Sequence, residues 1–247
     1  MFVAASSQCF SDVKFEEACQ QLADLEYDRV EIWMHNAGTH LSPQEVGADP
    51  ERFAHRYREQ TRLTPIAFHL EDDVPLELFD GICRAAKLLR ITQITIPSAE
   101  LGTPFNEEID RLRSRLLISN RSGLLLSLKT QIGRLTEDPR TAVELCQAIQ
   151  GLGLTLDVSH YIAGPHANHS YDPLFGYVYH IHFRDTSPTQ LQVPVGLGEV
   201  DYARIISMLS QFHYHRALSV EVLPGLLAGA DRSLEMRKLR MLLETLL

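Results

Sequence analysis

Short apolar runs alternate with longer amphipathic segments along the whole chain, and this alternation limits the possible folds more than any other feature. Eight runs have the length and apolar character of buried strands, at residues 2–6, 29–33, 64–70, 93–97, 123–129, 153–157, 178–183 and 217–222. Each run is followed by a segment long enough to form a helix. Strands that alternate with helices predict parallel βαβ units.

The segments between these runs have the apolar periodicity of amphipathic helices. In the first of them, Phe15, Ala18 and Leu22 recur at helical spacing, and Asp12 is placed to cap the helix. In a later one, Pro139 suits the first turn. We expect helices at 12–25, 50–61, 76–89, 105–116, 139–150, 202–210 and 232–246, and a short helical piece near 172–176.

The length of the chain, 247 residues, is close to the roughly 250 residues of a typical (β/α)₈ barrel. Closing eight strand–helix units on themselves gives that fold. We therefore predict a single-domain TIM barrel of the α/β class over residues 1–247. An open doubly wound sheet is the alternative. It is disfavoured because no glycine-rich phosphate loop follows the first strand.

The composition of the chain limits the kinds of partner that we expect it to bind. The formal net charge is −9 and no stretch concentrates Lys and Arg, so we do not expect a nucleic-acid partner. No apolar stretch approaches the length of a membrane span, and the first residues lack a signal-peptide pattern. We therefore expect no membrane association. The four cysteines are scattered and form no Cys-x-x-Cys pair, which favours a reduced, cytoplasmic protein.

Three of the later predicted strands end in residues that commonly bind metals. Asp157, His182 and Glu221 lie near the ends of the sixth, seventh and eighth strands. Burying a carboxylate in an apolar strand is costly unless a cation, a proton or hydrogen bonds compensate it. The strand ends of a barrel converge on one face, so the three side chains are expected at one site. An oxygen-rich site with one imidazole suits Mn²⁺, Mg²⁺, Co²⁺ or Zn²⁺.

Three segments carry a recognisable pattern: Leu154-Thr155-Leu156-Asp157-Val158-Ser159-His160, His180-Ile181-His182-Phe183-Arg184-Asp185 and Gly196-Leu197-Gly198-Glu199-Val200-Asp201-Tyr202. They resemble the signature segments of the xylose isomerase-like barrel family, the sugar phosphate isomerase/epimerase group. This group includes ketose 3-epimerases, hydroxypyruvate isomerases and inosose dehydratases. The resemblance covers nearly the whole chain, including Tyr27-Asp28-Arg29-Val30-Glu31-Ile32-Trp33.

This resemblance implies roles for individual residues. In the family a divalent metal is typically held by Glu, Asp, His and Glu from strands five to eight, and Asp157, His182 and Glu221 match the last three. The resemblance also implies that His160 and Arg184 contact substrate hydroxyls or a carboxylate. In the epimerases the first and last glutamates exchange a proton with the carbon next to a carbonyl, which makes Glu221 a catalytic candidate. The implied substrate is a small sugar, polyol or sugar acid, and a homo-oligomer is compatible with the family.

Lys129 departs from the family pattern. The segment Leu126-Ser127-Leu128-Lys129-Thr130 matches the family's first glutamate segment, with Lys129 at the glutamate position. Protonated Lys has only hydrogen-bond donors and cannot ligate a metal.

Three arrangements of Lys129 remain open. Lys129 occupies the place of the metal and pairs with Asp157 and Glu221, so that no metal binds. It swings away and leaves a three-ligand metal site with added water. Or its pKa is lowered, and it serves as a catalytic base or Schiff-base nucleophile.

Four more polar residues are candidates for the same end of the barrel. Glu31 lies in the second predicted strand and suits either a substrate contact or a structural carboxylate network. His69, at the end of the third strand, is a candidate for substrate binding. His166 and His169 lie in the irregular segment 165–177 and fit either a lid or a solvated loop.

Two functions from different classes follow, and a third is disfavoured. The first is an isomerase, epimerase or related lyase that acts on a small carbohydrate-like substrate. The second is a non-catalytic metabolite-binding protein of the same fold, in which Lys129 replaces the metal. An endonuclease IV-like phosphodiesterase shares the barrel. It needs more ligands for several zinc ions and usually a basic surface, so Lys129 and the net charge of −9 disfavour it.

Overall fold

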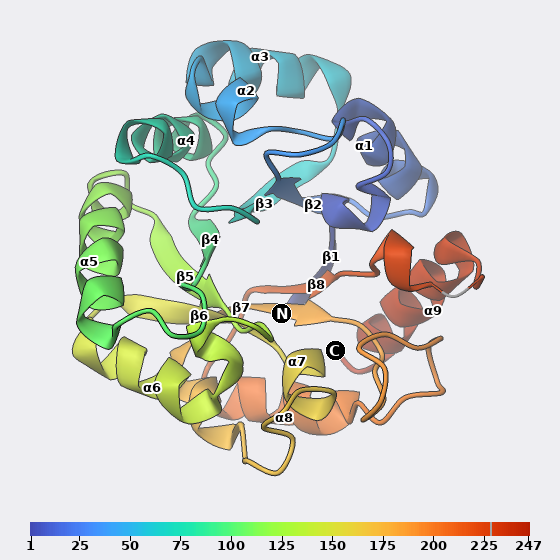
Figure 1. The fold of residues 1–247 in the computed structure, drawn as a ribbon. Helices are drawn as coiled ribbons and strands as arrows, with labels where there is room; N and C mark the ends of the chain where they lie inside the picture. Colours follow the sequence, from blue (N-terminus) through green and yellow to red (C-terminus); the bar gives the residue numbers. More distant parts are fainter. Residues whose placement is uncertain (228) are drawn as a thin grey trace.

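Eight parallel strands form a closed barrel in the computed structural model, which describes residues 1–227 and 229–247. The strands are β1 (Phe2–Ser6), β2 (Arg29–Met34), β3 (Thr64–Leu70), β4 (Gln93–Pro97), β5 (Leu125–Lys129), β6 (Leu152–Asp157), β7 (Val178–Phe183) and β8 (Ala217–Val220). They follow one another in sequence order, and β8 pairs with β1 to close the ring (Figure 1). The predicted (β/α)₈ TIM barrel is confirmed.

Helices surround the barrel on its outside (Figure 1). They are α1 (Phe15–Asp24), α2 (Pro43–Gly47), α3 (Pro50–Gln60), α4 (Leu76–Leu88), α5 (Phe105–Arg121), α6 (Pro139–Ala148), α7 (Ser159–Ile162), α8 (Tyr202–Gln211) and α9 (Arg232–Thr245). Short 3₁₀ turns are η1 (Ser7–Phe10), η2 (Leu135–Glu137), η3 (Asp172–Tyr177) and η4 (Pro224–Leu226). Every predicted helix is present, and the piece expected near 172–176 is η3.

Two short helices, α2 and α7, lie in segments where the sequence predicted none. At the start of α2, the Ser42 hydroxyl accepts a bond from the Glu45 N–H (3.2 Å) and the Glu45 carboxylate accepts one from the Ser42 N–H (3.1 Å). This capping box satisfies N–H groups that a helix start leaves unpaired. Each helix is too short to show apolar periodicity, which explains why the pattern missed both.

The fifth strand begins at Leu125, two positions later than the predicted start at Gly123. Gly123 has a φ of +72°, and its N–H donates to the carbonyl of Asn120 (3.0 Å). A glycine in this left-handed conformation ends a helix, so Gly123 belongs to the turn after α5. The helix α5 correspondingly extends to Arg121, beyond the predicted end at 116.

The two faces of the strands differ in polarity, and this difference positions the site. In β5 the apolar Leu126 and Leu128 join the core between barrel and helices, whereas the Ser127 hydroxyl bonds to Thr155 (2.6 Å) inside the barrel. Residues two apart in a strand point to the same side. Lys129 therefore projects into the barrel, one layer above Ser127.

Two further expectations concern the whole chain. In the described part of the chain, no helix is both long enough and apolar enough to cross a membrane. All four cysteines are buried and free, as expected for small residues of the core.

Candidate active site

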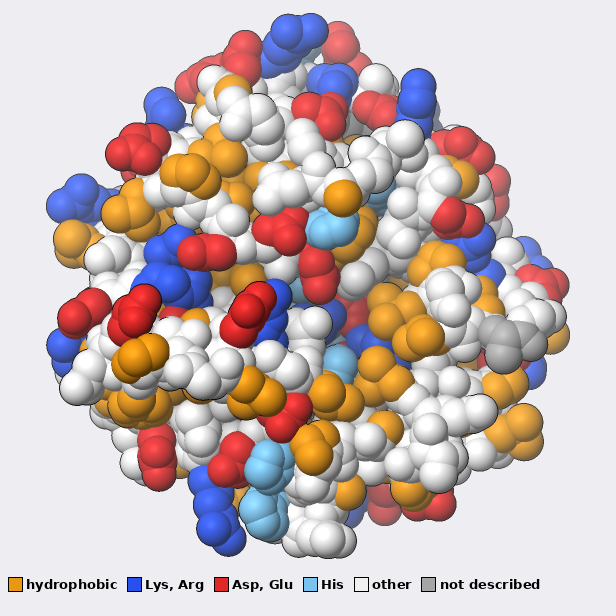
Figure 2. Space-filling model, in the orientation of Figure 1, with side chains coloured by type: hydrophobic (Ala, Val, Ile, Leu, Met, Phe, Trp, Pro, Cys, Tyr) orange, Lys and Arg blue, Asp and Glu red, His pale blue; other side chains and the backbone are white. Residues whose placement is uncertain are grey.

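Polar and charged residues gather where the strands end, on the face that carries the loops leading from strands to helices. Lys129 and Asp157 are the last residues of β5 and β6, His182 is near the end of β7, and Glu221 directly follows β8. Figure 2 shows acidic, basic and histidine side chains close together near the centre of this face. The structure thus brings the sequence-predicted residues to one end of the barrel, as barrel geometry requires.

Two cations and two carboxylates form the centre of this cluster. The ammonium of Lys129 lies 2.8 Å from Oε1 and 3.1 Å from Oε2 of Glu221. The guanidinium of Arg184 donates to Oδ2 of Asp157 (2.5 Å) and also to Oε2 of Glu221. All four side chains are buried, and Lys129 is the most accessible with 4% of its surface exposed. The cluster is therefore charge-balanced without any added ion.

The surroundings hold these groups in their charged forms. Burial by itself would raise the pKa of Glu221, but the charges of His182, Lys129 and Arg184 together keep it below its ordinary value. Burial would lower the pKa of Lys129, but the carboxylates of Glu221 and Glu71 raise it above its ordinary value. Lys129 is therefore an ammonium ion at neutral pH, and this charge state does not suit the predicted role as a base or Schiff-base nucleophile.

The arrangement corresponds in part to the first of the three predicted ones. Lys129 points inward and pairs with Glu221, but Asp157 pairs with Arg184 instead of with Lys129. Both oxygens of Glu221 are in contact with cations, and Oδ1 of Asp157 accepts from the Ser159 hydroxyl (2.5 Å). A divalent ion would have to displace two buried cations, so the predicted set of Asp157, His182 and Glu221 does not fit a metal as it is arranged here.

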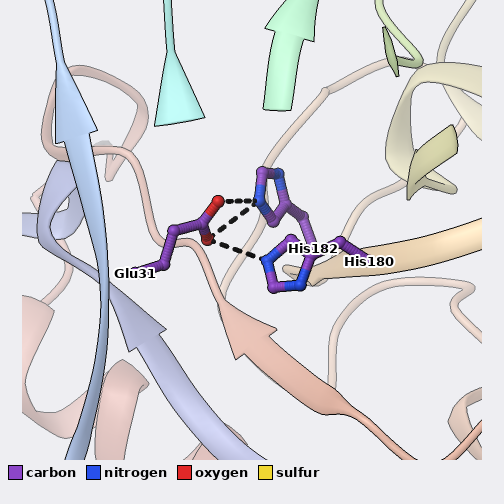
Figure 3. Close-up of side chains that lie close together, drawn as sticks. All are labelled: Glu31, His180 and His182. Atoms are coloured by element: carbon purple, nitrogen blue, oxygen red, sulfur yellow. Dashed lines mark hydrogen bonds and ion pairs between the residues drawn. The ribbon is translucent and has the colours of Figure 1, made fainter. Parts of the chain in front are cut away.

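A second polar layer lies directly beside this cluster, centred on Glu31 (Figure 3). Nε2 of His182 lies 2.9 Å from both carboxylate oxygens of Glu31, and Nε2 of His180 lies 3.2 Å from Oε2. The Ser219 hydroxyl donates to the same Oε2 (2.6 Å). Burial would raise the pKa of Glu31, but the two histidines hold it well below its ordinary value. Glu31 therefore fixes the ring of His182, whose Nδ1 faces Glu221 at 3.2 Å.

His69 lies between the layer centred on Glu31 and the mouth of the barrel, which is the open end where the strands terminate. Its Nδ1 is 3.8 Å from Glu221 and 3.9 Å from Glu31, and its Nε2 is 3.8 Å from Glu71. Burial, reinforced by Lys129, lowers the pKa of His69 to about 3, so the ring is neutral at neutral pH. Glu71 in turn accepts from the indole N–H of Trp33 (2.9 Å). These contacts place His69 in the polar wall of the mouth.

His160 lies at the rim, on α7, where the short helix turns its ring toward Asp157. Nδ1 of His160 accepts from the Ile132 N–H (3.2 Å), and Nε2 lies 3.5 Å from Oδ2 of Asp157. Burial lowers the pKa of His160 to about 4. A neutral imidazole with its Nδ1 used as an acceptor carries its proton on Nε2, so His160 presents a hydrogen-bond donor toward Asp157.

Sequence reasoning missed some members of the cluster. Glu71 follows β3 and contributes negative charge near Lys129, and Ser219 holds Glu31. Ser219 stands two positions before Glu221, so strand alternation was the available signal for it, as it was for His180 two positions before His182, which the sequence does place on the same side of its strand. No pattern in the sequence singled out Glu71, because its role depends on the position of β3 beside β2 and β4.

The comparisons with known proteins agree on one architecture. The family model described as "Xylose isomerase-like TIM barrel" matches residues 19–240. A solved structure titled as a xylose isomerase-like TIM barrel protein from Mycobacterium smegmatis in complex with magnesium has a TM-score of 0.78 at 14% identity, covering 99% of this chain and 95% of that one. No curated protein sequence matches the chain significantly.

Two further solved structures are similar over nearly their full lengths. An L-ribulose 3-epimerase has a TM-score of 0.76 at 16% identity, covering 100% of this chain and 96% of that one. A structure titled as IOLI protein with a binding zinc atom has a TM-score of 0.72 at 16% identity, covering 100% and 98%. At these identities the similarity shows the shared fold.

Proposed function

The chain belongs to the xylose isomerase-like TIM barrel family, and on this basis we propose that it acts on a small sugar, polyol or sugar acid at the mouth of its barrel, as an isomerase or epimerase. Support for the reaction class comes from the family and from neighbours named as sugar epimerases. Support for the location comes from the charged cluster at the strand ends. The observation that carries the proposal is the buried pair of Lys129 and Glu221, 2.8 Å apart.

Isomerisation and epimerisation both remove a proton next to a carbonyl and return a proton to carbon. The proton returns to the neighbouring carbon in isomerisation and to the opposite face of the same carbon in epimerisation. A base takes a proton from the carbon next to the carbonyl, and a positive group stabilises the charge that develops on the oxygen. In the proposal, Glu221 is the base, and the Lys129 ammonium is the positive group in the place where the family uses a metal ion. No step requires a divalent ion, because the fixed cations Lys129 and Arg184 supply the positive charge.

Binding of the substrate is assigned to the polar residues around this pair. Arg184 and His160 suit hydroxyl or carboxylate groups, because one is a fixed cation and the other a neutral ring at the rim. His69 and Glu31 form the polar wall behind them, with 1% and 0% of their surfaces exposed. A substrate carbonyl that contacts Lys129 would lie beside Arg184 and His160 and beside the polar wall of His69 and Glu31.

A second candidate, a non-catalytic metabolite-binding protein, is favoured by one specific observation. Glu221 is in contact with both Lys129 and Arg184, and these charges contribute to holding its pKa below its ordinary value. A carboxylate stabilised in this way is a weaker base. In this alternative the same cluster binds a polar ligand without transferring a proton.

Proton exchange separates the two functions. The chelator-treated protein is incubated in D₂O with a panel of ketoses, aldoses and sugar acids, and loss of the proton next to the carbonyl is followed by NMR. The proposal expects exchange on at least one compound without added metal, and loss of that exchange in Glu221→Gln. Glu199→Gln, an exposed glutamate on the loop before α8, is the matched control and should leave exchange unchanged.

The alternative has its own expected result. If a compound of the panel raises the thermal midpoint but no proton exchanges, the binding function replaces the enzymatic one. If exchange occurs only after a divalent ion is added, the assignment of Lys129 as the positive group is wrong.

A further inference from the structure

A group of metal-ligating side chains lies outside the charged cluster of the mouth, where the loop after α7 meets the start of α6. The donor atoms of Asp138, His166 and His169 all lie within 4.8 Å of one another. Glu137, the neighbour of Asp138, points its Oε1 toward the same place, 3.6 Å from Nε2 of His166. In Figure 2 histidine side chains lie next to acidic ones in this part of the surface, over the α6 and α7 region.

The distances fit donors around one small ion. Nδ1 of His169 lies 3.7 Å from Oδ1 of Asp138, close to the 3.6 Å between His166 and Glu137. Donor atoms on one tetrahedral Zn²⁺, with bonds of about 2.0–2.2 Å, lie roughly 3.3–3.6 Å apart. The two rings lie at a centroid separation of 5.2 Å with their planes tilted by 36°, and the turn between them is closed by the His169 N–H, which donates to the His166 carbonyl (2.8 Å).

These donors retain free coordinating capacity. Nδ1 of His169 is buried and has no hydrogen-bond partner among the residues that the structure describes. Glu137 uses Oε2 to accept from the Gly133 N–H (2.7 Å), which orients the carboxylate and leaves Oε1 toward His166. Asp138 caps α6 through Oδ1, which accepts from the Arg140 N–H (2.9 Å). Two carboxylates and two imidazoles provide two negative charges for a divalent ion, and each carboxylate is already held in place by the backbone.

Accessibility distinguishes this group from the two other groups of possible ligands in the described residues. Those two, built around His182, are buried in the barrel next to Lys129 and Arg184. Here the side chains of His166, His169 and Asp138 are 30–35% exposed, so an ion can enter from solvent.

We propose that Asp138, His166 and His169, with Glu137, form a binding site for a divalent transition ion such as Zn²⁺, separate from the active site. The ion joins the loop after α7 to the start of α6. Two imidazoles with carboxylate oxygens select Zn²⁺, Co²⁺ or Ni²⁺ over Mg²⁺.

Titration of the chelator-treated full chain with ZnCl₂ at pH 7.5, followed by calorimetry, tests the site directly. The expected result is one saturable Zn²⁺ per chain. His166→Ala and His169→Ala should each weaken binding by roughly 100-fold or more, since even groups that only orient a ligand are worth about 10–100-fold. Asp138→Asn should weaken it while keeping the helix cap, because Asn and Asp cap equally well.

His55→Ala is the matched control, since His55 is also an exposed histidine beside a carboxylate, 3.3 Å from Glu59, but belongs to none of the groups of possible ligands in the described residues. It should bind Zn²⁺ as the native chain does. Absence of saturable binding in the native chain would overturn the proposal. So would unchanged binding in His166→Ala and His169→Ala, or an equal loss in His55→Ala. Because circular dichroism reports folding independently, a variant that loses binding counts only if its spectrum is native.

Discussion

The ammonium of Lys129 and the carboxylate of Glu221 are in direct contact, at 2.8 and 3.1 Å, although the two residues are 92 positions apart in the sequence. Lys129 ends β5 and Glu221 follows β8, so the contact crosses the mouth of the barrel. Arg184 joins the same carboxylate and bridges it to Asp157. Ion pairs among its own side chains therefore stabilise the mouth. The stability of the fold and its response to added metal ions should depend on these pairs.

Removing the Lys129 ammonium should destabilise the fold, because the buried carboxylate of Glu221 then loses one of its positive partners. Lys129→Met keeps the length of the side chain but leaves Glu221 with less positive charge around it, from Arg184 and His182. The expected loss is about 3 kcal/mol of unfolding free energy, the lower end for a broken buried pair. Urea unfolding at pH 7 measures it. Arg84→Met, which breaks a pair with Asp80 in which both side chains are more than half exposed, should cost less than about 1 kcal/mol.

A double-mutant cycle tests whether that loss comes from the pair. Lys129→Met combined with Glu221→Gln should cost less than the sum of the two single changes, because the second change removes the unpaired charge. Additive losses would show that Lys129 and Glu221 are not energetically coupled.

Restoring the family's glutamate should create metal dependence. Lys129→Glu places a third carboxylate beside Asp157 and Glu221, so repulsion destabilises the metal-free variant and an oxygen-rich donor set becomes available. Mg²⁺ at 100 times its dissociation constant should then stabilise the variant by about 2.7 kcal/mol, or roughly 5–10 °C in thermal midpoint. Lys87→Glu, on the exposed side of α4, is the control. An equal shift with Mg²⁺ in the native chain or the control would contradict the prediction.

Acid should weaken the fold before the carboxylates titrate, because His160 is buried and neutral. Its pKa falls from the ordinary 6.5 to about 4, so the unfolded chain takes up the proton first and stability is lost as pH falls from 6.5 toward 4. Between pH 7 and pH 5 this group contributes a loss of about 2 kcal/mol. His160→Gln should reduce the loss by that amount in urea unfolding at the two pH values. An identical pH dependence in the variant would rule out His160 as its source.

Replacing Ser219 should lower the free energy of unfolding more than the loss of a single small hydroxyl usually does. Its hydroxyl donates to Glu31 inside the barrel (2.6 Å), and a hydrogen bond to a buried charge contributes about 1.5–3 kcal/mol. Ser219→Ala should lower the free energy of unfolding by that amount. Ser210→Ala is the control, since this hydroxyl only donates to the Ile206 carbonyl within α8, and it should cost about 0.5 kcal/mol or less. Equal effects of the two changes would contradict the role of Ser219.

Much of the fold could be predicted because the pattern is local and repeated. Six of the eight predicted strands begin at the observed residue, and the larger of the two exceptions has a local cause. Gly123 adopts a left-handed φ and ends a helix, and β6 begins at Leu152, one residue before the predicted start. The short helix α2 carried a signal in Ser42 and Glu45, but five residues are too few for periodicity to reveal it.

The motifs determined the family, and the strand ends determined where the polar residues would meet. Parallel strands in a closed barrel all end on one face, so a residue's place in its strand is enough to assign it to the mouth. Lys129, at the position that the resemblance assigns to a metal-binding glutamate, also predicted an incomplete ligand set, because an ammonium has no lone pair.

What only the tertiary structure decided is which charges meet. The sequence left open whether Lys129 would pair with Asp157 and Glu221, turn away or lose its proton. In the folded barrel Arg184 reaches Asp157, Glu71 adds negative charge beside Lys129, and Glu221 receives both cations. Coulomb energies of buried groups depend on separations of a few ångströms across different strands. Sequence spacing fixes the strand on which a charge sits, whereas the closure of the barrel sets the distance between two charges.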